Sequence, residues 1–229
     1  MYFCPAMCKH ILHIDTSIAT GVVAITTDGK VIASSTSTEE RNHASSINGM
    51  VSKVLGDTEL QLSDLHAIAV IGGPGSYTGL RIGLATAKGY CYALDLPLMM
   101  HNRLDLLALQ KIKMGVTNEA ILALLPARQE EYFFTLYSHD GTCLIPARHA
   151  LEKEIIEVMK AYNPSISGVL AKTMKDIVME MHVDFSENEH FSLDFWASFA
   201  HQPDNCNSFV NFFTAEPFYL KHVHTHNAR

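Results

Sequence analysis

The chain has 229 residues, of which 48% are hydrophobic and 18% charged, and this suits one globular unit or two small lobes with a sizeable core. It contains no run of about 18 apolar residues that would span a membrane. Residues 1–10 lack the charged and apolar regions of a secretory signal. We therefore expect a cytoplasmic protein that does not bind membranes.

The cysteines and the net charge exclude two further classes of protein. The five cysteines are odd in number and scattered, without a Cys-x-x-Cys pair, which argues against a disulfide framework. The formal net charge is −7 at pH 7, and no long Lys or Arg run is present. The chain therefore lacks the electrostatic footprint of a stand-alone nucleic-acid binder, and any RNA that it serves is expected to be held by a partner.

Residues 1–102 predict a first lobe of strands and helices. Apolar runs bounded by turn residues predict strands at 10–15, 22–27, 31–37, 67–71 and 96–101. Apolar residues at helical spacing predict helices from Asn42 to Gly56, at 80–94 and at 104–113. This order of elements predicts an α/β fold.

Residues 103–229 predict a smaller second lobe, with a tail that is a candidate to return to the first. Strands are expected at 119–125, 132–137, 142–146 and 166–170, and helices at 151–161 and 172–181. Residues 182–215 show no firm period and predict irregular structure with some helix. No internal repeat or low-complexity tract is present.

The run from Gly72 to Gly89 is the most informative part of the sequence. It follows a buried strand and passes through a glycine-proline turn into a helix. Such a unit presents backbone N–H groups at a helix N-terminus, where an anion is favoured. Gly73, Gly75 and Ser76 are therefore candidate phosphate-binding residues, although glycines serve a tight strand-to-helix passage equally well.

A set of motifs occurs in the order seen in the TsaB family, and the chain resembles that family over nearly its whole length. They are Asp15-Thr16-Ser17, Asn42 to Ser45, GGPGSYTGLRIGLATAKG at 72–89, Leu96-Pro97, Ala127-Arg128 and Pro217-x-Tyr219-Leu220-Lys221. The resemblance implies the two-lobed fold of actin, sugar kinases and heat-shock ATPases (ASKHA), with a reduced second lobe. It also implies the non-catalytic, dimerising subunit of the machinery that forms N6-threonylcarbamoyladenosine next to the tRNA anticodon.

The resemblance further implies the partners. These are a TsaD-like catalytic subunit, a TsaE-like ATPase reached through the complex, and tRNA bound only through the complex, while a homodimer of the free protein stays open. ATP and metal are expected on the partner, so this chain needs no cofactor. TsaD carries a His-x-x-x-His metal pair after its proline-led strand, and residues 97–107 lack that pair. The second lobe also lacks a recognisable glycine-rich adenosine-binding segment, which implies that the active site is lost.

Two features of the first lobe have alternative interpretations. Asp15, Thr16 and Ser17 resemble a vestigial phosphate loop, but the usual glycine is missing, which favours a carboxylate that hydrogen-bonds a neighbouring turn. Small residues recur at i, i+4 and i+8 of the second helix and allow another backbone to approach, either inside the lobe or on a partner. The resemblance favours a partner seam, made of Gly79, Gly83 and Ala87 with Ile47, Met50 and Val54 of the preceding helix.

Other functions and candidate residues stay open. An ATP-using enzyme of the sugar-kinase type and a peptidase acting on its paralogue are the alternatives, and Ser76 lacks a sequence-identifiable base for nucleophilic catalysis. His43 suits a capping or a binding role equally. The groups Cys4-Cys8-His10 and His222 to His226 are weak metal candidates, better explained as an exposed extension and a frayed tail. Pro126 replaces the aspartate that precedes Ala127-Arg128 in the family.

Overall fold

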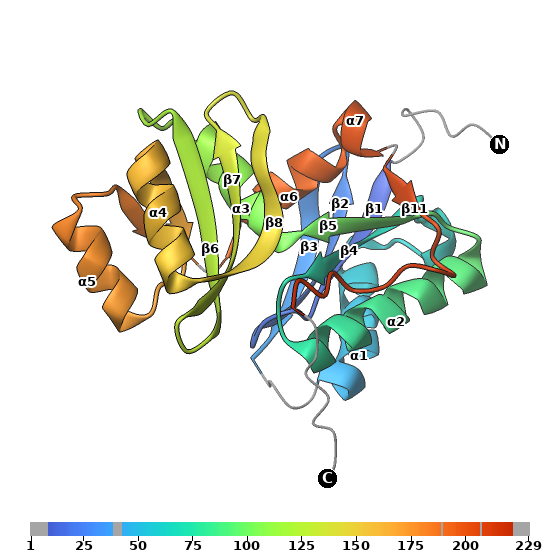
Figure 1. Cartoon of the computed structure of the whole chain (residues 1–229). Helices are drawn as coiled ribbons and strands as arrows, with labels where there is room; N and C mark the ends of the chain where they lie inside the picture. The colour runs from blue at the N-terminus through green and yellow to red at the C-terminus, as the bar shows by residue number, and fades with distance from the viewer. Residues whose placement is uncertain (1–8, 39–42, 189, 207, 222–229) are drawn as a thin grey trace, which may run out of the picture. The chain divides into compact units, whose positions relative to one another are not determined.

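A computed structural model describes the chain except for a few short stretches, and it divides the chain into two compact units (Figure 1). The described residues are 9–38, 43–188, 190–206 and 208–221. Unit 1 comprises Met1–Arg103 and Ser192–Phe218, and unit 2 comprises Leu104–Phe191 and Tyr219–Arg229. The α/β class predicted from the sequence is confirmed.

The described part of unit 1 is built on a six-stranded sheet with the order β11-β5-β4-β1-β2-β3. Its strands are β1 (His10–Asp15), β2 (Gly21–Thr27), β3 (Lys30–Ser37), β4 (Ala67–Gly73), β5 (Leu98–Asn102) and β11 (Phe209–Val210). The first three form the predicted antiparallel meander, and β4 and β5 run parallel to β1. Parallel strands end at the same edge of a sheet, so the loops after β1, β4 and β5 meet there.

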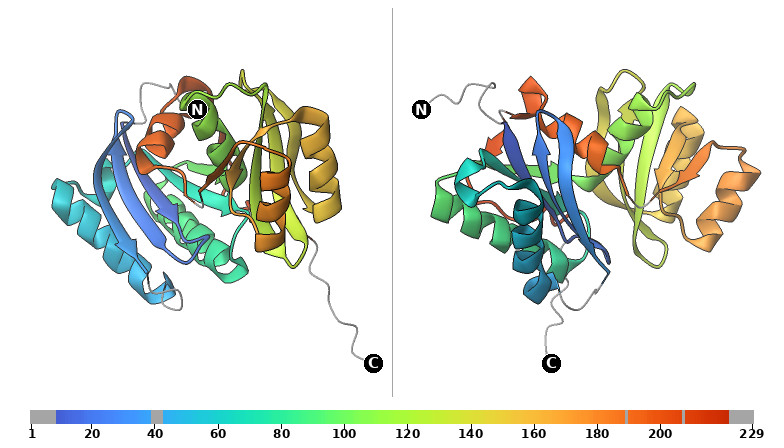
Figure 2. Two further views of the ribbon diagram at one scale, coloured as in Figure 1. Left: turned by 90° about the vertical axis from the view of Figure 1, so that its left-hand side faces the viewer. Right: turned by 180° about the vertical axis from the view of Figure 1, so that it is seen from behind.

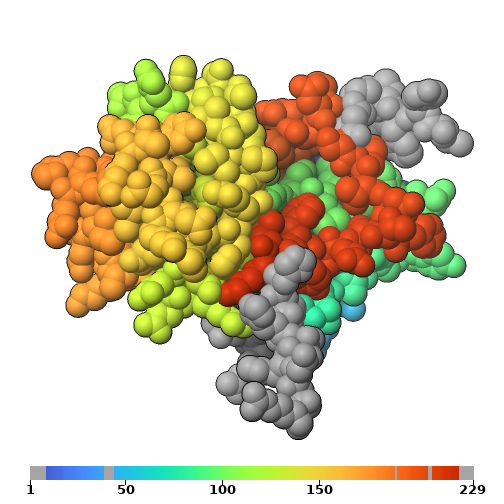
Figure 3. Space-filling view, viewed as in Figure 1, coloured from blue at the N-terminus to red at the C-terminus, as the bar shows by residue number. Residues whose placement is uncertain are grey.

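Helices cover both faces of this sheet (Figure 2). The helices α1 (His43–Thr58) and α2 (Tyr77–Leu94) bury alternate strand residues such as Leu12 and Ile14 in the core. The helix α6 (Leu193–Ala200) lies on the opposite face, and α7 (Pro203–Cys206) follows it. After β11 the chain runs along the surface of unit 1 beside α2 (Figures 1 and 3).

A cluster of neutral rings fixes α6 to the sheet. Trp196 is fully buried and donates its indole N–H to Nδ1 of His101 at 2.8 Å. Its ring meets that of His13 edge-on, with 4.6 Å between the centroids. The Nε2 atoms of His13 and His201 each lie 2.9 Å from the Thr26 hydroxyl. These contacts depend on uncharged imidazoles, because burial penalises the protonated ring.

The described part of unit 2 holds a five-stranded sheet with the order β10-β9-β6-β7-β8. Its strands are β6 (Ala120–Arg128), β7 (Glu131–Ser138), β8 (Cys143–Leu151), β9 (Ser165–Gly168) and β10 (Phe185–Glu187). Two helices, α4 (Glu152–Tyr162) and α5 (Lys172–Glu180), bury their apolar sides on one face around Phe134. The helix α3 (Arg103–Lys113) lies on the other face (Figure 2).

The structure departs from the sequence-based elements at three places. Gly56 was expected to end α1, but the helix continues to Thr58 because an exposed glycine weakens a helix without breaking it. The strand β8 extends to Leu151, beyond the expected 146. The segment 182–215 contains β10, α6, α7 and β11, and it holds together through tertiary contacts that leave no period in the sequence. None of the helices in the described residues is long and apolar enough to cross a membrane.

Acidification is expected to destabilise unit 1 through the ring cluster. Burial lowers the pKa of His101 to about 4, and burial with the neighbouring histidines holds the pKa of His13 well below 6.5. The unfolded chain takes up these protons near its ordinary histidine pKa, whereas the folded chain does not. The free energy of unfolding therefore falls as the pH drops from about 6.5 toward about 4, by on the order of 3 kcal/mol for His101 alone.

Urea unfolding between about pH 7 and about pH 4.5 measures this loss. The variant His101→Gln keeps an acceptor for the Trp196 indole but cannot take up the proton, so its stability should depend less on pH. The exposed His139 provides the matched control as His139→Gln. The same pH dependence in all three proteins would contradict the assignment.

Candidate functional site

The candidate site lies at the edge of the unit 1 sheet where β1 and β4 end. Asp15 is the last residue of β1, the loop after it carries Thr16 and Ser17, and the glycine turn after β4 leads into α2. The two segments touch, since the Ser76 N–H donates to the Ser17 carbonyl oxygen at 2.7 Å. The structure thus brings together the two groups of residues that the sequence singled out as phosphate-binding candidates.

The Asp15 carboxylate is engaged on both oxygens. Its Oδ1 accepts from the backbone N–H of Ser17 at 2.9 Å and from the Ser17 hydroxyl at 2.6 Å. Its Oδ2 forms an ion pair with the guanidinium of Arg103. Arg103 also donates from Nε and Nη2 to the Ser17 oxygen, at 3.1 and 2.8 Å. The side chains of Arg103 and Asp15 are only 1% and 6% exposed, so this is a buried charge pair with charge-assisted hydrogen bonds.

The glycines of the turn accommodate this loop. A Cβ added at Gly75 would overlap the Ser17 carbonyl oxygen, and one added at Gly79 would overlap that of Thr16. The Thr16 hydroxyl donates to the Gly79 carbonyl at 2.7 Å, and a Cβ at Gly83 would lie 2.5 Å from the same hydroxyl. The lack of side chains at these glycines is therefore explained inside unit 1, because the chain's own loop approaches them closely.

The remaining turn residues are also occupied within unit 1. Ser76 is the N-cap of α2, and its hydroxyl accepts from the Gly79 N–H at 3.3 Å. The Gly72 carbonyl accepts from the Phe218 N–H at 2.8 Å. Gly73, at φ +135°, lies against the Phe218 backbone, with 3.1 Å between its would-be Cβ and the Phe218 oxygen. The sequence favoured a carboxylate that hydrogen-bonds a neighbouring turn; in the structure Asp15 accepts from Ser17, two residues further on, and pairs with Arg103.

The six residues of the expected partner seam lie inside unit 1, and the structure corrects that choice. Ile47, Met50 and Val54 are at most 8% exposed and belong to the core beneath α1. Three small residues of α2, Gly79, Gly83 and Ala87, are buried on its inward side. Helical spacing identifies a small-residue stripe, but it does not say which neighbour the stripe meets.

The opposite sides of the same two helices are exposed. In the part of the chain that the structure describes, and apart from the helix's own backbone, no atom lies within 4 Å of a would-be Cβ on Gly49 or Gly56 of α1 or on Gly89 of α2. The Tyr90 hydroxyl donates to Asn48 Oδ1 at 3.0 Å and holds the two helices side by side at this level. We call this surface, made of Gly49, Gly56, Ala85, Gly89 and Tyr92, the outer face of α1 and α2.

Arg103 and Phe218 were missed by the sequence analysis. Arg103 had a signal, because it is the single Lys or Arg in the largely apolar stretch 96–109, and a buried charge requires a partner. No feature of the sequence marked Phe218, since it is one of several aromatic residues in a segment without periodicity. The groups Cys4-Cys8 and His222 to His226 lie outside the described residues, as does the side chain of His43.

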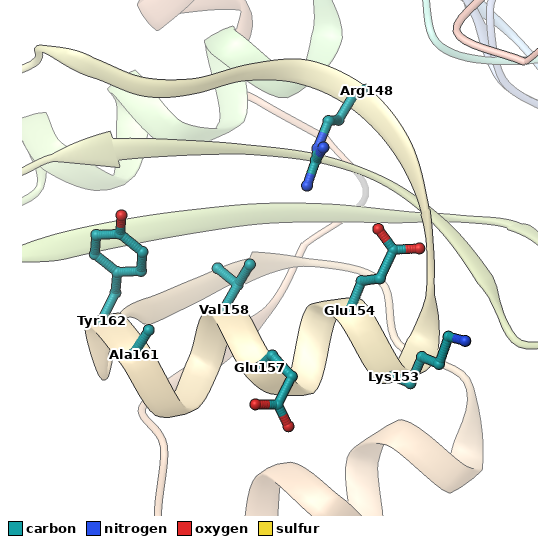
Figure 4. Close-up of a pocket in the computed structure, with 7 residues that line it drawn as sticks. All are labelled: Arg148, Lys153, Glu154, Glu157, Val158, Ala161 and Tyr162. Carbon is teal, nitrogen blue, oxygen red and sulfur yellow. The ribbon is translucent and has the colours of Figure 1, made fainter.

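Unit 2 contains a hollow of about 640 Å³ between β8 and α4 (Figure 4). Its lining is formed by Arg148, Lys153, Glu154, Glu157, Val158, Ala161 and Tyr162. Several of its charged groups are engaged within unit 2: Glu154 accepts from the Leu151 N–H at 3.2 Å, and Glu157 pairs with Lys160 at 2.8 Å. Within the described residues, no group of three or more His, Cys, Asp or Glu is placed to hold a metal ion.

Fold and site together define a two-unit α/β protein. At one edge of its first sheet, a loop and a glycine turn meet as they do in a phosphate-binding site, but the groups that would face a ligand contact other groups of the chain instead. The family model described as "TsaD: tRNA N6-adenosine threonylcarbamoyltransferase" matches residues 30–215. The chain therefore belongs to this family. The structure of YeaZ from Pseudomonas aeruginosa is 27% identical, with a TM-score of 0.69, and the match covers 93% of this chain and 100% of that one. The two units, each built on a sheet with helices, agree with the α/β fold expected from the sequence, and the assignment to the ASKHA fold stays a prediction.

Two curated relatives are named "tRNA threonylcarbamoyladenosine biosynthesis protein TsaB". The one from Bacillus subtilis is 31% identical over 154 residues, which cover 66% of each chain. The one from Escherichia coli is 35% identical over 131 residues, which cover 57% of this chain and 55% of the relative. The chain thus spans somewhat less than two thirds of these relatives, and the resemblance to TsaB stated from its sequence is confirmed.

Loss of either member of the buried pair should destabilise the protein. Asp15→Ala leaves a buried guanidinium without its carboxylate, and Arg103→Met leaves the carboxylate without its cation. Each is expected to lower the free energy of unfolding by about 3–5 kcal/mol, whereas the double variant should lose less than the sum. Urea unfolding of the four proteins measures the coupling. As a control, Glu157→Ala removes an ion pair whose side chains are 59% and 71% exposed, and it should cost at most about 1 kcal/mol. Strictly additive losses would contradict the pairing.

Proposed function

We propose that the protein is a non-catalytic subunit of the complex that forms N6-threonylcarbamoyladenosine in tRNA, and that it supports a TsaD-like catalytic subunit. The family match and the TsaB relatives support the process. The observation that carries the non-catalytic role is the Asp15 carboxylate, whose two oxygens are taken up by Arg103 and Ser17. A carboxylate that is engaged on both oxygens and paired with a buried guanidinium is poorly disposed to ligate a metal that carries a nucleotide.

The proposed partners follow from the same role. ATP and metal belong to the catalytic partner, and a TsaE-like ATPase and tRNA associate through the complex. The net charge of −7 opposes the independent approach of a polyanion. In this proposal the protein acts in the cytoplasm, and the free chain is open to homodimerisation.

We further propose that the partner binds the outer face of α1 and α2. Glycine in the middle of an exposed helix costs about 0.5–1 kcal/mol relative to alanine. Among the described residues, Gly49, Gly56 and Gly89 have no neighbour that would require this loss of stability. A partner helix that approaches closely would supply the reason, and Tyr92, which is 73% exposed, offers an aromatic anchor beside it.

The isolated chain is expected to form no threonylcarbamoyladenosine and to hydrolyse ATP no faster than background. The measurement is ATP turnover and nucleoside formation by the chain alone, by its TsaD-like partner alone and by the mixture. ATP turnover by the isolated chain that is lost in Asp15→Asn would support the sugar-kinase alternative and overturn the proposal. Cleavage of the partner by the isolated chain that is lost in Ser76→Ala would instead support the peptidase alternative.

Substitutions on the two sides of the helices should separate assembly from folding. Gly89→Leu on the outer face is expected to weaken the complex with the TsaD-like partner at least tenfold, about 1.4 kcal/mol, without unfolding the isolated chain. Gly83→Leu is the inward control and should destabilise the isolated chain, because its side chain would meet Thr16. Light scattering of the mixture and thermal unfolding of each variant provide the readouts. An intact complex with Gly89→Leu would place the partner elsewhere.

A further inference from the structure

Two strongly exposed aromatic side chains of unit 1 lie against each other. Tyr92, near the end of α2, is 73% exposed, and Phe213, in the turn after β11, is 70% exposed. Their rings meet edge-on, with 6.2 Å between the centroids. Single exposed apolar side chains are common on proteins, but two such rings from distant parts of the chain form an apolar patch, and patches of this kind are typical of interaction surfaces. We call these two residues the aromatic pair.

The turn that carries Phe213 is fixed by its own hydrogen bonds and by its neighbour. Oδ1 of Asn211 accepts from the Phe213 N–H at 3.0 Å, which is an Asx turn. The Asn211 carbonyl oxygen accepts from the N–H groups of Thr214 and Ala215 at 3.1 and 2.9 Å. The Phe212 ring packs against the core of unit 1, and its centroid lies 4.3 Å from that of Phe213. The fold thus presents Phe213 on an ordered backbone, which lowers the entropy that a partner loses by covering it.

The aromatic pair continues the outer face of α1 and α2. Tyr92 follows Gly89 by three residues, so the two lie on the same side of the helix. The segment after β11 runs beside α2 and places Phe213 against Tyr92 (Figure 1). The outer face is therefore extended by a ring that belongs to neither helix.

The outer face alone offers a partner little apolar area. Four of its five residues are Gly or Ala, which permit close approach but have almost no side chain to bury. Stable interfaces bury about 800 Å² on each partner, and a few large side chains, often aromatic, supply most of the binding energy. A stable complex on this face therefore needs a further anchor beside Tyr92, and Phe213 is placed to provide it.

We propose that Tyr92 and Phe213 form one anchor for the TsaD-like partner, and that a helix of the partner on the outer face brings an apolar side chain onto both rings. This inference rests on the proposed function and adds to it a residue outside α1 and α2. The two rings act as a unit, because each one limits the positions that the partner's side chain can take against the other. Since both rings are exposed in the free chain, their removal changes assembly and leaves folding intact.

Titration calorimetry of the full-length chain with its TsaD-like subunit tests the anchor. Phe213→Ala is expected to weaken the complex at least tenfold, with little change in the Tm of the isolated chain. Tyr92→Ala should act in the same way, and the double variant should lose less than the product of the two fold-changes. Met179→Ala, which removes an apolar side chain of unit 2 that is 71% exposed, is the matched control and should bind as the native chain does.

Hydrogen exchange provides a second measurement that needs no substitution. Addition of the TsaD-like subunit should slow the exchange of the amides in residues 211–215 severalfold. The amides of α5, which carries Met179, should exchange at the same rate with and without the partner. Unchanged exchange in residues 211–215 would contradict the anchor.

The outcomes separate the anchor from the proposed function. If Phe213→Ala binds with native affinity while Gly89→Leu weakens the complex, the anchor is overturned and the proposed partner surface stands. If the native chain does not bind the TsaD-like subunit, the proposed function is overturned, and the anchor with it. If Phe213→Ala dissociates a homodimer of the free chain but leaves the complex intact, the aromatic pair serves a second copy of the chain, which also overturns the proposal.

Discussion

The buried ion pair between Arg103 and Asp15 is the interaction on which the arrangement of unit 1 depends. A guanidinium removed from water is tolerated only when it is paired and its N–H groups are hydrogen-bonded. Asp15 and Ser17 meet this demand only if the loop after β1 folds back on itself. That folding presents the Ser17 carbonyl to Ser76 at the start of α2. One buried charge on the first residue of α3 thus specifies the end of β1 and the entry to α2.

The glycine turn shows how one sequence feature serves two different ends. In a phosphate site, glycines let a ligand approach the backbone, and here they let the chain itself do so. Gly75 and Gly79 face the carbonyl oxygens of the β1 loop, whereas Gly72 and Gly73 face Phe218. The same residue type at the same spacing therefore fits a ligand site and its internally closed counterpart. Only the atoms opposite each glycine distinguish the two.

Much of the fold was predictable because its elements carry local signals. The meander β1 to β3, the buried strand β4 and the helix α2 follow from apolar period and turn residues, and the structure places them close to the expected residues. The helix α6 was not predictable, because its run of eight residues is too short to show a firm period and its position depends on Trp196 meeting His13 and His101. Arg103 was recognisable as a lone cation, but its partner could be found only by knowing that β1 and β5 end at one edge.

The partner seam was expected on the inward side of α2 for a physical reason, and the same reason points to the outward side instead. The helix α2 carries small residues on both sides, Gly83 and Ala87 inward and Ala85 and Gly89 outward. Spacing alone treats the two stripes alike. The inward stripe is explained by the β1 loop and the sheet, which leave no room for larger side chains. The outward stripe has no such cause within the described chain. Since an exposed helical glycine lowers stability, the outward stripe is the one whose explanation must come from another molecule.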